Sequence, residues 1–228
     1  PTGAIRTGVT VVSGVVDAGA GKVSIHGRLD STASTTYQRG VMFGYGGSDV
    51  SVLSSNSAAD AILIRGDASM SSGGWCRGLD IYETVNPNLL IANEGVGGVQ
   101  IIADGCASNA TGGNRQDGLP LSNVSILARS GDIRLEGTTR NTDSTAWGIF
   151  LNRSGGTGNA GVAIGASTRS YTLATGKTVS IQTSSSKIEF LTNSINGDFT
   201  PISTSGTVSI RSRVGFSFSS SPILTNIS

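Results

Sequence analysis

The sequence is short of the residues on which most enzymes and nucleic-acid-binding proteins rely. Its 228 residues include one histidine and two cysteines, and 14% of them are charged, against a usual share of about 25%. Aromatic residues make up only 5% of the chain, and the formal net charge is +1. A charge so close to zero gives no electrostatic basis for binding nucleic acid or an anionic membrane surface. We therefore expect no nucleic-acid partner.

Long apolar runs are absent as well. No stretch approaches the roughly 20 apolar residues that cross a bilayer, so we expect no transmembrane segment. The chain starts without a basic-then-apolar signal sequence, and we expect it to be a piece of a longer protein. Cys76 and Cys106 are too few for a disulfide framework. They form either one bridge or two small buried side chains, and the sequence leaves both alternatives open.

What the chain has in excess is glycine, with 33 residues, alongside Ser, Thr and Asn. The usual share of glycine is about 7%, roughly half the share found here. Disordered segments combine such polarity with few β-branched residues and a high net charge. Here Val and Ile recur in short alternating runs, and alternation places apolar side chains on one face of a strand. The pattern therefore predicts an all-β protein whose outside is polar.

An internal repeat organises these strands. Each copy reads apolar-x-apolar-x-Gly, then a polar stretch, then Gly-apolar-x-apolar. The first glycines of the copies are Gly27, Gly66, Gly105 and Gly137, and the second are Gly40, Gly78, Gly118 and Gly148. Successive first glycines lie 39, 39 and 32 residues apart. We expect them to be structural, supplying the turn conformations needed at the corners between strands.

Short strands with one apolar face bury that face by stacking, which predicts a parallel β-helix, or β-solenoid, with irregular loop excursions. We expect a single solenoid over residues 1–228, with internal repeats near 21–59, 60–98, 99–130 and 131–165. A repeat of 39 residues suits roughly two coils of about 20 residues each. A propeller fits less well, because neither Trp75 nor Trp147 is followed by Asp, and hairpin turns of a sandwich do not account for the repeat.

Several phrases of the sequence resemble the filamentous haemagglutinin-like adhesin repeats of bacteria. They are Ser130–Gly137 (SGDIRLEG), Ser205–Ile210 (SGTVSI) and Gly148–Asn152 (GIFLN). The resemblance covers most of residues 21–215 and implies a right-handed shaft in a large secreted or surface-attached protein. Its members act in adhesion, biofilm and fibre formation, without chemistry in the shaft. It implies an extracellular or cell-surface location, and partners that are copies of the chain or flanking repeats of its parent. The family's secretion domain is not found in this sequence.

The sequence offers few residues that could catalyse a reaction. His26 occupies the x position of the first repeat, where an outward, solvated side chain is expected. The motif Asn141-Thr142-Asp143 matches one element of the pectin-hydrolysing β-helix enzymes, but its companion motifs are missing. Gly156–Gly161 fits a dinucleotide-binding glycine pattern without a helix to follow it. We expect no catalytic residue, no metal site and no cofactor. A polysaccharide-cleaving enzyme, with carboxylates brought together across coils, remains a third hypothesis.

Binding is the second hypothesis. Arg65-Gly66-Asp67 spells the tripeptide read by integrins and is a candidate receptor motif. Exposed aromatic residues around Trp75, Tyr82 and Trp147 could stack on the sugar faces of host or matrix glycans. Candidate glycosylation sites are the sequons at Asn109, Asn123, Asn152 and Asn226.

Overall fold

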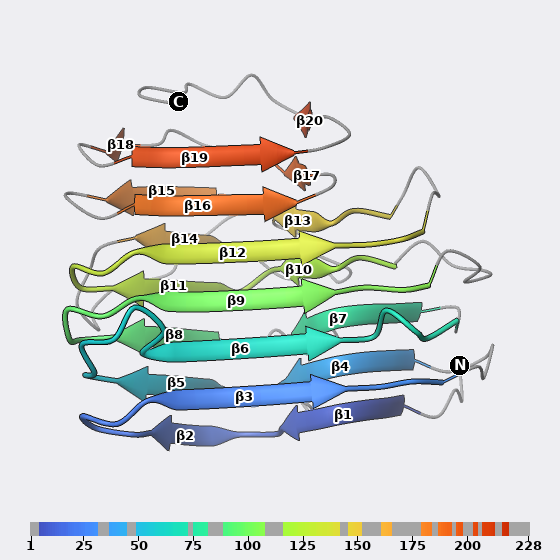
Figure 1. The fold of residues 1–228 in the computed structure, drawn as a ribbon, viewed down its shortest axis with the longest axis horizontal. Helices are drawn as coiled ribbons and strands as arrows, with labels where there is room; N and C mark the ends of the chain where they lie inside the picture. Colours follow the sequence, from blue (N-terminus) through green and yellow to red (C-terminus); the bar gives the residue numbers. More distant parts are fainter. Residues whose placement is uncertain are drawn as a thin grey trace.

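The computed structural model describes residues 5–31, 37–44, 49–72, 75–81, 89–107, 116–141, 146–151, 161–165, 179–183, 187–192, 195–197, 203–204, 207–212 and 216–218. Every regular element in these ranges is a β-strand, and the described strands all pair in parallel. The chain winds as a right-handed β-solenoid from its blue N-terminal end to its red C-terminal end (Figure 1). This confirms the predicted fold class. The described residues contain no helix that could cross a membrane.

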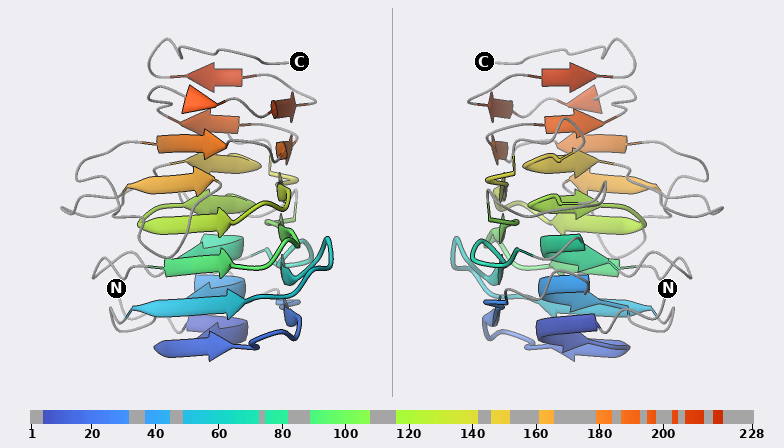
Figure 2. Two further views of the ribbon diagram at one scale, coloured as in Figure 1. Left: turned by 90° about the vertical axis from the view of Figure 1, so that its left-hand side faces the viewer. Right: turned by 90° about the vertical axis from the view of Figure 1, so that its right-hand side faces the viewer.

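Three layers of strands form the wall of the solenoid (Figures 1 and 2). The front sheet contains β3 (Val23–Arg28), β6 (Ile62–Asp67), β9 (Val99–Asp104), β12 (Ile133–Thr138), β16 (Lys187–Thr192) and β19 (Thr207–Ser212). The rear-left sheet contains β2 (Gly14–Asp17), β5 (Val50–Ser54), β8 (Leu89–Asn93), β11 (Val124–Ala128), β14 (Val162–Gly165), β15 (Val179–Thr183) and β18 (Ser203–Thr204). The rear-right layer contains β1 (Ile5–Val11), β4 (Tyr37–Phe43) and β7 (Trp75–Ile81), then β10 (Leu119–Leu121), β13 (Ile149–Leu151), β17 (Ile195–Gly197) and β20 (Phe216–Phe218).

One sequence repeat makes one coil, so the expectation of two coils for each repeat was wrong. Gly27 pairs in register with Gly66, 39 residues later, on the neighbouring strand of the front sheet. Each early coil has three strands and long connections, as in β4–β5–β6, and this accounts for its length. Only near the C-terminal end does the coil shorten to the expected size, where Lys187 pairs with Thr207, 20 residues later.

The third repeat was also placed two residues out of register. Gly66 pairs with Ala103, not with Gly105, because Ile62 pairs with Val99. The apolar alternation continues through Val99-Gln100-Ile101 and hides this shift in the sequence, since a two-residue slip keeps the same face inward. Gly105 therefore follows β9 and does not occupy the position that Gly66 holds in β6.

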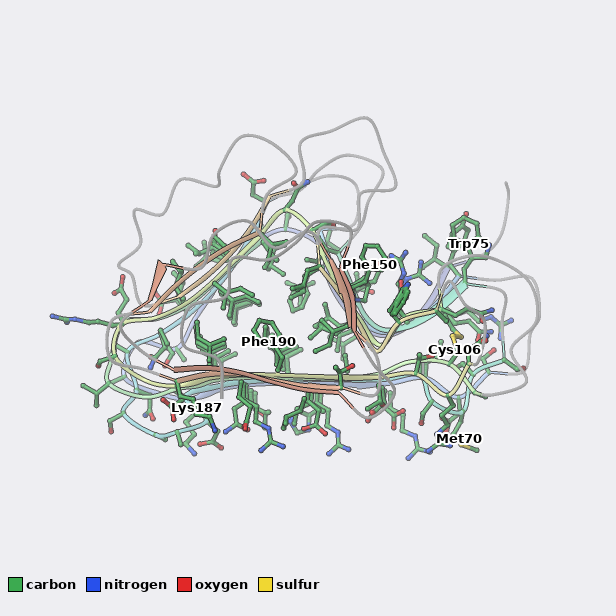
Figure 3. All side chains as sticks on the ribbon, turned by 90° about the horizontal axis from the view of Figure 1, so that it is seen from above. Met70, Trp75, Cys106, Phe150, Lys187 and Phe190 are labelled. Atoms are coloured by element: carbon green, nitrogen blue, oxygen red, sulfur yellow. A yellow bond between two sulfur atoms is a disulfide. The ribbon has the colours of Figure 1, made fainter. Side chains whose placement is uncertain are left out.

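The main core is the aliphatic interior enclosed by the three layers (Figure 3). From β4 to β14, and again in β16, the inward positions carry mostly Val, Ile, Leu or Phe, and most of these side chains are fully buried or nearly so; examples are Val41, Val52, Ile64, Ile101, Leu121, Ile126, Leu135, Ile149, Ile164 and Phe190. Full burial of such a side chain contributes about 1.5–3 kcal/mol. Since each row stacks on an equivalent row, the stabilisation is spread over the length of the solenoid.

The repeat glycines form a waist that closes the main core on one side. A Cβ atom on Gly27, Gly66 or Gly137 would collide with the carbonyl oxygen of Gly40, Gly78 or Gly148, respectively. The front sheet and the rear-right layer thus touch backbone to backbone at each of these pairs. Among the described residues, glycines with positive φ are Gly14, Gly19 and Gly44. The repeat glycines are therefore required by close approach, and the expectation that they serve turn conformations was wrong.

A proline divides the rear-right layer into two sheets. Leu119 donates its N–H to the Gly148 carbonyl on the side of β13. Because alternate residues of a strand direct their N–H groups to opposite sides, position 120 would donate toward β7. Pro120 has no N–H, so it cannot make that ladder bond. The Leu79 N–H still donates across the gap to the Gly118 carbonyl.

Candidate functional site

Polar and aromatic side chains cluster where β4 and β7 extend past the waist. Residues 37–39 and 75–77 precede the waist glycines and lie outside the main core. We call this region, together with the residues bonded to it, the side compartment; its members are Ser31, Tyr37, Gln38, Arg39, Ser71, Trp75, Cys76, Arg77, Asp80 and Cys106. Figure 3 shows Trp75 and Cys106 together at one end of the cross-section, with Phe190 in the main core. Consecutive strand residues face opposite ways, so the compartment has two faces.

The inward face holds a disulfide between Cys76 and Cys106, with 5.5 Å between their Cα atoms. It joins the second residue of β7 to the segment that follows β9, 30 residues later in the chain. Gln38 lies in register with Cys76 and donates its amide to the Ser31 hydroxyl at 3.0 Å. Backbone hydrogen bonds join this corner from coil to coil. The Ser72 N–H donates to the Ser31 carbonyl, and the Ala107 N–H donates to the Ser71 carbonyl. The inward face is thus a cross-linked corner.

The outward face holds an ion cluster that is buried. Asp80 accepts hydrogen bonds from Arg39 Nε on one carboxylate oxygen and from Arg77 Nη1 on the other. The side chains of Arg39, Arg77 and Asp80 are only 6%, 1% and 3% exposed. Arg39 and Arg77 are register partners on neighbouring strands, so a single carboxylate can bridge them. Arg39 also donates through Nη1 to the Gln38 and Trp75 carbonyls.

Asp80 is held in its charged form despite its burial. Burial alone would raise the pKa of this carboxyl group, because a low-dielectric environment disfavours charge. The positive charges of Arg39 and Arg77, and the hydrogen bonds that they donate, outweigh burial and lower the pKa of Asp80 below its usual value. The cluster is therefore a stable ion group and not a site that exchanges protons near neutral pH.

An aromatic pair lies beside the ion cluster. The rings of Tyr37 and Trp75 are 4.9 Å apart between centroids and tilted by 60°. The Arg39 guanidinium carbon lies 5.4 Å from the Tyr37 ring centroid, within range of a cation–π contact. Both rings are half-buried, so they keep a solvent-facing surface. The sequence had grouped Trp75 with Tyr82 and Trp147; finding Tyr37 as its partner requires the strand register, which spacing alone does not give.

Tyr82 lies outside the described residues. Trp147 is half-buried and is tied to a different coil, since its backbone N–H donates to Asp117 Oδ1 at 3.0 Å. The described residues therefore do not gather the three predicted aromatics into one platform.

The candidate receptor motif runs along β6 and not over a loop. Arg65 is exposed, but Gly66 is a buried waist glycine. Asp67 accepts hydrogen bonds on Oδ1 from the backbone N–H and the hydroxyl of Ser69, at 2.9 and 2.7 Å, and Arg28 Nε lies 4.0 Å from Oδ2. Asp67 is thus engaged within the protein, which weakens it as a receptor ligand.

Asp67 also bears on the hypothesis of polysaccharide cleavage. Asp67 and Asp104 are register partners, so two acidic residues do lie side by side on neighbouring strands of the front sheet. A glycosidase needs one such group to be a proton donor with a raised pKa. Burial favours a raised pKa for Asp67, yet the Ser69 hydrogen bonds and the charges of Arg28 and Arg65 lower it. Asp104 accepts a hydrogen bond from the Thr138 hydroxyl at 2.5 Å. Asp67 therefore lacks the raised pKa that a proton donor needs.

The remaining predicted residues do not form a site. His26 is exposed on the outer face of β3, with Nε2 3.1 Å from the Ser24 hydroxyl. Asn123 is 6% exposed and has a φ of 48°, and its carbonyl accepts the Leu89 N–H, so it is closed to a glycosylating enzyme in the folded chain. Asn109, Asn152 and Asn226 lie outside the described residues, as do Thr142, Asp143 and 156–160.

Metal ligands do not cluster in the described ranges, where no group of three or more His, Cys, Asp or Glu side chains could hold an ion. Comparisons with family models, with curated proteins and with solved structures found no significant match. The resemblance to haemagglutinin repeats therefore stays a prediction from the sequence.

Proposed function

We propose that this chain is a structural, non-catalytic segment of an extracellular fibre or surface adhesin. The observation that carries the proposal is the unbroken front sheet, in which six parallel strands align residue on residue. A coil of this kind is buried only by the coils on either side of it. Further coils can therefore be added without changing the core, which is what a fibre shaft requires.

The side compartment supports the same function. Its disulfide joins segments 30 residues apart in sequence, and its ion cluster bridges two neighbouring strands. Such cross-links resist the separation of neighbouring coils. Structural disulfides persist in oxidising compartments, so Cys76–Cys106 also favours an extracellular or cell-surface location.

A direct test uses antibodies raised against the folded chain, with immunogold microscopy of intact source cells. Gold particles along filaments that extend from the cell surface are expected. Label confined to the cell interior would overturn the proposal. Cells treated with antibody that was first saturated with the free chain provide the control for non-specific binding.

A glycan-binding module is the alternative, favoured by the half-exposed Tyr37–Trp75 pair. Aromatic side chains bury apolar sugar faces at little entropic cost because they have few rotatable bonds. Binding on a glycan array that Trp75→Ala abolishes would support it. The control is Val15→Ala, which alters an exposed side chain in another layer, 65% accessible. Silence of the native chain across a broad array would remove this alternative.

A further inference from the structure

In the part of the chain that the structure describes, no strand pairs with β1, β2 or β3 on the side away from β4, β5 and β6. Val16 and Ile25 point inward from β2 and β3 and pack against the main core, yet both are only half-buried. Their register partners one coil further on, Val52 and Ile64, have no exposed surface. The inward direction is thus the same in both coils, and among the described residues they differ in having strands on one side or on both. We call the exposed set the first-coil face; it consists of Val9, Val11, Val16, Ala18 and Ile25.

The two ends of the described solenoid match each other. Strands β1, β2 and β3 stand at one end of the sheet orders, and β20, β18 and β19 stand at the other end of the same three layers. All run parallel to their neighbours. A parallel edge strand carries N–H and C=O groups able to pair with a further strand of the same direction. The last coil therefore offers the strand directions that the first-coil face requires.

We propose that the first-coil face binds the last coil, β18–β20, of a second copy, with the strands of each layer continuing in parallel. The contact repeats the coil-on-coil packing already present within the chain, with Val9, Val16 and Ile25 becoming fully buried like their register partners. Because the two surfaces are different, the contact is heterologous and does not close, so copies form an open filament. This inference rests on the proposed function, since it describes how such a shaft extends.

The test is sedimentation velocity of the full chain over a wide range of concentration. The weight-average mass is expected to rise beyond two copies and to keep rising, because each added copy presents a new first-coil face. A single copy at every concentration would overturn the proposal. So would growth that stops at two copies, since a face-to-face dimer leaves no surface for a third.

Val16→Lys and Val15→Lys make a matched pair of variants. Val16 belongs to the first-coil face, whereas Val15 is the preceding residue on the same strand and points outward, 65% exposed. Val16→Lys is expected to abolish growth and Val15→Lys to leave it unchanged, with both variants keeping the native circular dichroism spectrum. Equal loss of growth in both would contradict the assignment of this face.

Hydrogen exchange gives a reading that does not depend on any variant. The amides of β1–β3 are expected to become protected as the concentration rises, while those of β6 and β9 stay protected throughout. Protection that does not change with assembly would place the contact elsewhere and overturn the inference. The proposed shaft function would survive that outcome, because immunogold labelling tests it separately.

Discussion

The main core and the side compartment lie on opposite sides of the same glycine waist, but they are stabilised in different ways. The main core relies on many aliphatic side chains, each adding a modest amount of buried apolar surface. The side compartment relies on one disulfide and one three-residue ion cluster. Stability is therefore distributed in the first region and concentrated in the second. Single substitutions should reveal that difference.

The largest effect is expected from Asp80→Asn. Removing this carboxylate leaves Arg39 and Arg77 charged in an environment where they are nearly inaccessible to water. Breaking a buried ion group in this way costs about 3–5 kcal/mol. Chemical denaturation of the native and variant chains would measure the change in the free energy of unfolding.

A triple variant separates the charge effect from the packing effect. Arg39→Met, Asp80→Leu and Arg77→Met together remove every charge of the cluster and keep similar volumes. Replacing a whole buried ion group by apolar residues is often neutral or stabilising. The triple variant is therefore expected to be more stable than Asp80→Asn. If it were equally unstable, the cluster would matter for its shape and not for its charge balance.

The disulfide is expected to give the next largest effect. Cys76 and Cys106 are 30 residues apart, and in the chain-entropy treatment a loop of that length corresponds to about 3.5 kcal/mol at 25 °C. Cys76→Ser with Cys106→Ser should lower the free energy of unfolding by about this amount, as should a reducing agent acting on the native chain. A reducing agent should have no effect on the double variant, which provides the control. An unchanged midpoint after reduction would show that the inward face is held by its hydrogen bonds instead.

The sequence predicted the main core well because its signal is periodic. Val23, Ile62 and Ile133 mark strands whose inward positions follow directly from the alternation. Coil length was not predictable in the same way, because the polar stretches between strands have no periodicity that tells a connection from a further strand. The 39-residue interval between Gly27 and Gly66 fits one long coil as well as two short ones.

The side compartment could not be assembled from the sequence for a related reason. Arg39, Arg77 and Asp80 are isolated charges in the chain, and they meet only because β4 and β7 pair in one register. The role of the waist glycines was not predictable either, since a glycine in a turn and a glycine in close backbone contact look identical in sequence. A buried charge at an outward strand position is the kind of feature that alternation rules assign to solvent.

Gly66→Ala tests the waist, with a smaller expected effect. The new methyl group would meet the Gly78 carbonyl, so the two layers would have to move apart. Overpacking of this kind costs about 1–3 kcal/mol. Ala103 occupies the equivalent position one coil later, so this coil already accommodates a methyl group. Ala103→Gly should therefore cost less than Gly66→Ala, and the reverse order would show that the waist is not a close-packing constraint.

Lowering the pH from neutrality is expected to have the smallest effect on the free energy of unfolding, and it again distinguishes the two regions. The pKa of Asp80 is lowered in the folded chain, so its contribution to stability is fully present above the ordinary aspartate pKa of about 3.9. That contribution is lost as the pH falls through the lower pKa of the folded state. The stability difference between the native chain and the triple apolar variant should therefore be constant from pH 7 to about 4.5 and should change only in stronger acid. Denaturant titrations of both chains at each pH provide the measurement, and carboxyl groups common to both, such as Asp67, cancel in the comparison. A difference that already changes between pH 7 and 5 would show that Asp80 titrates near neutrality and is not held in its charged form by the two arginines.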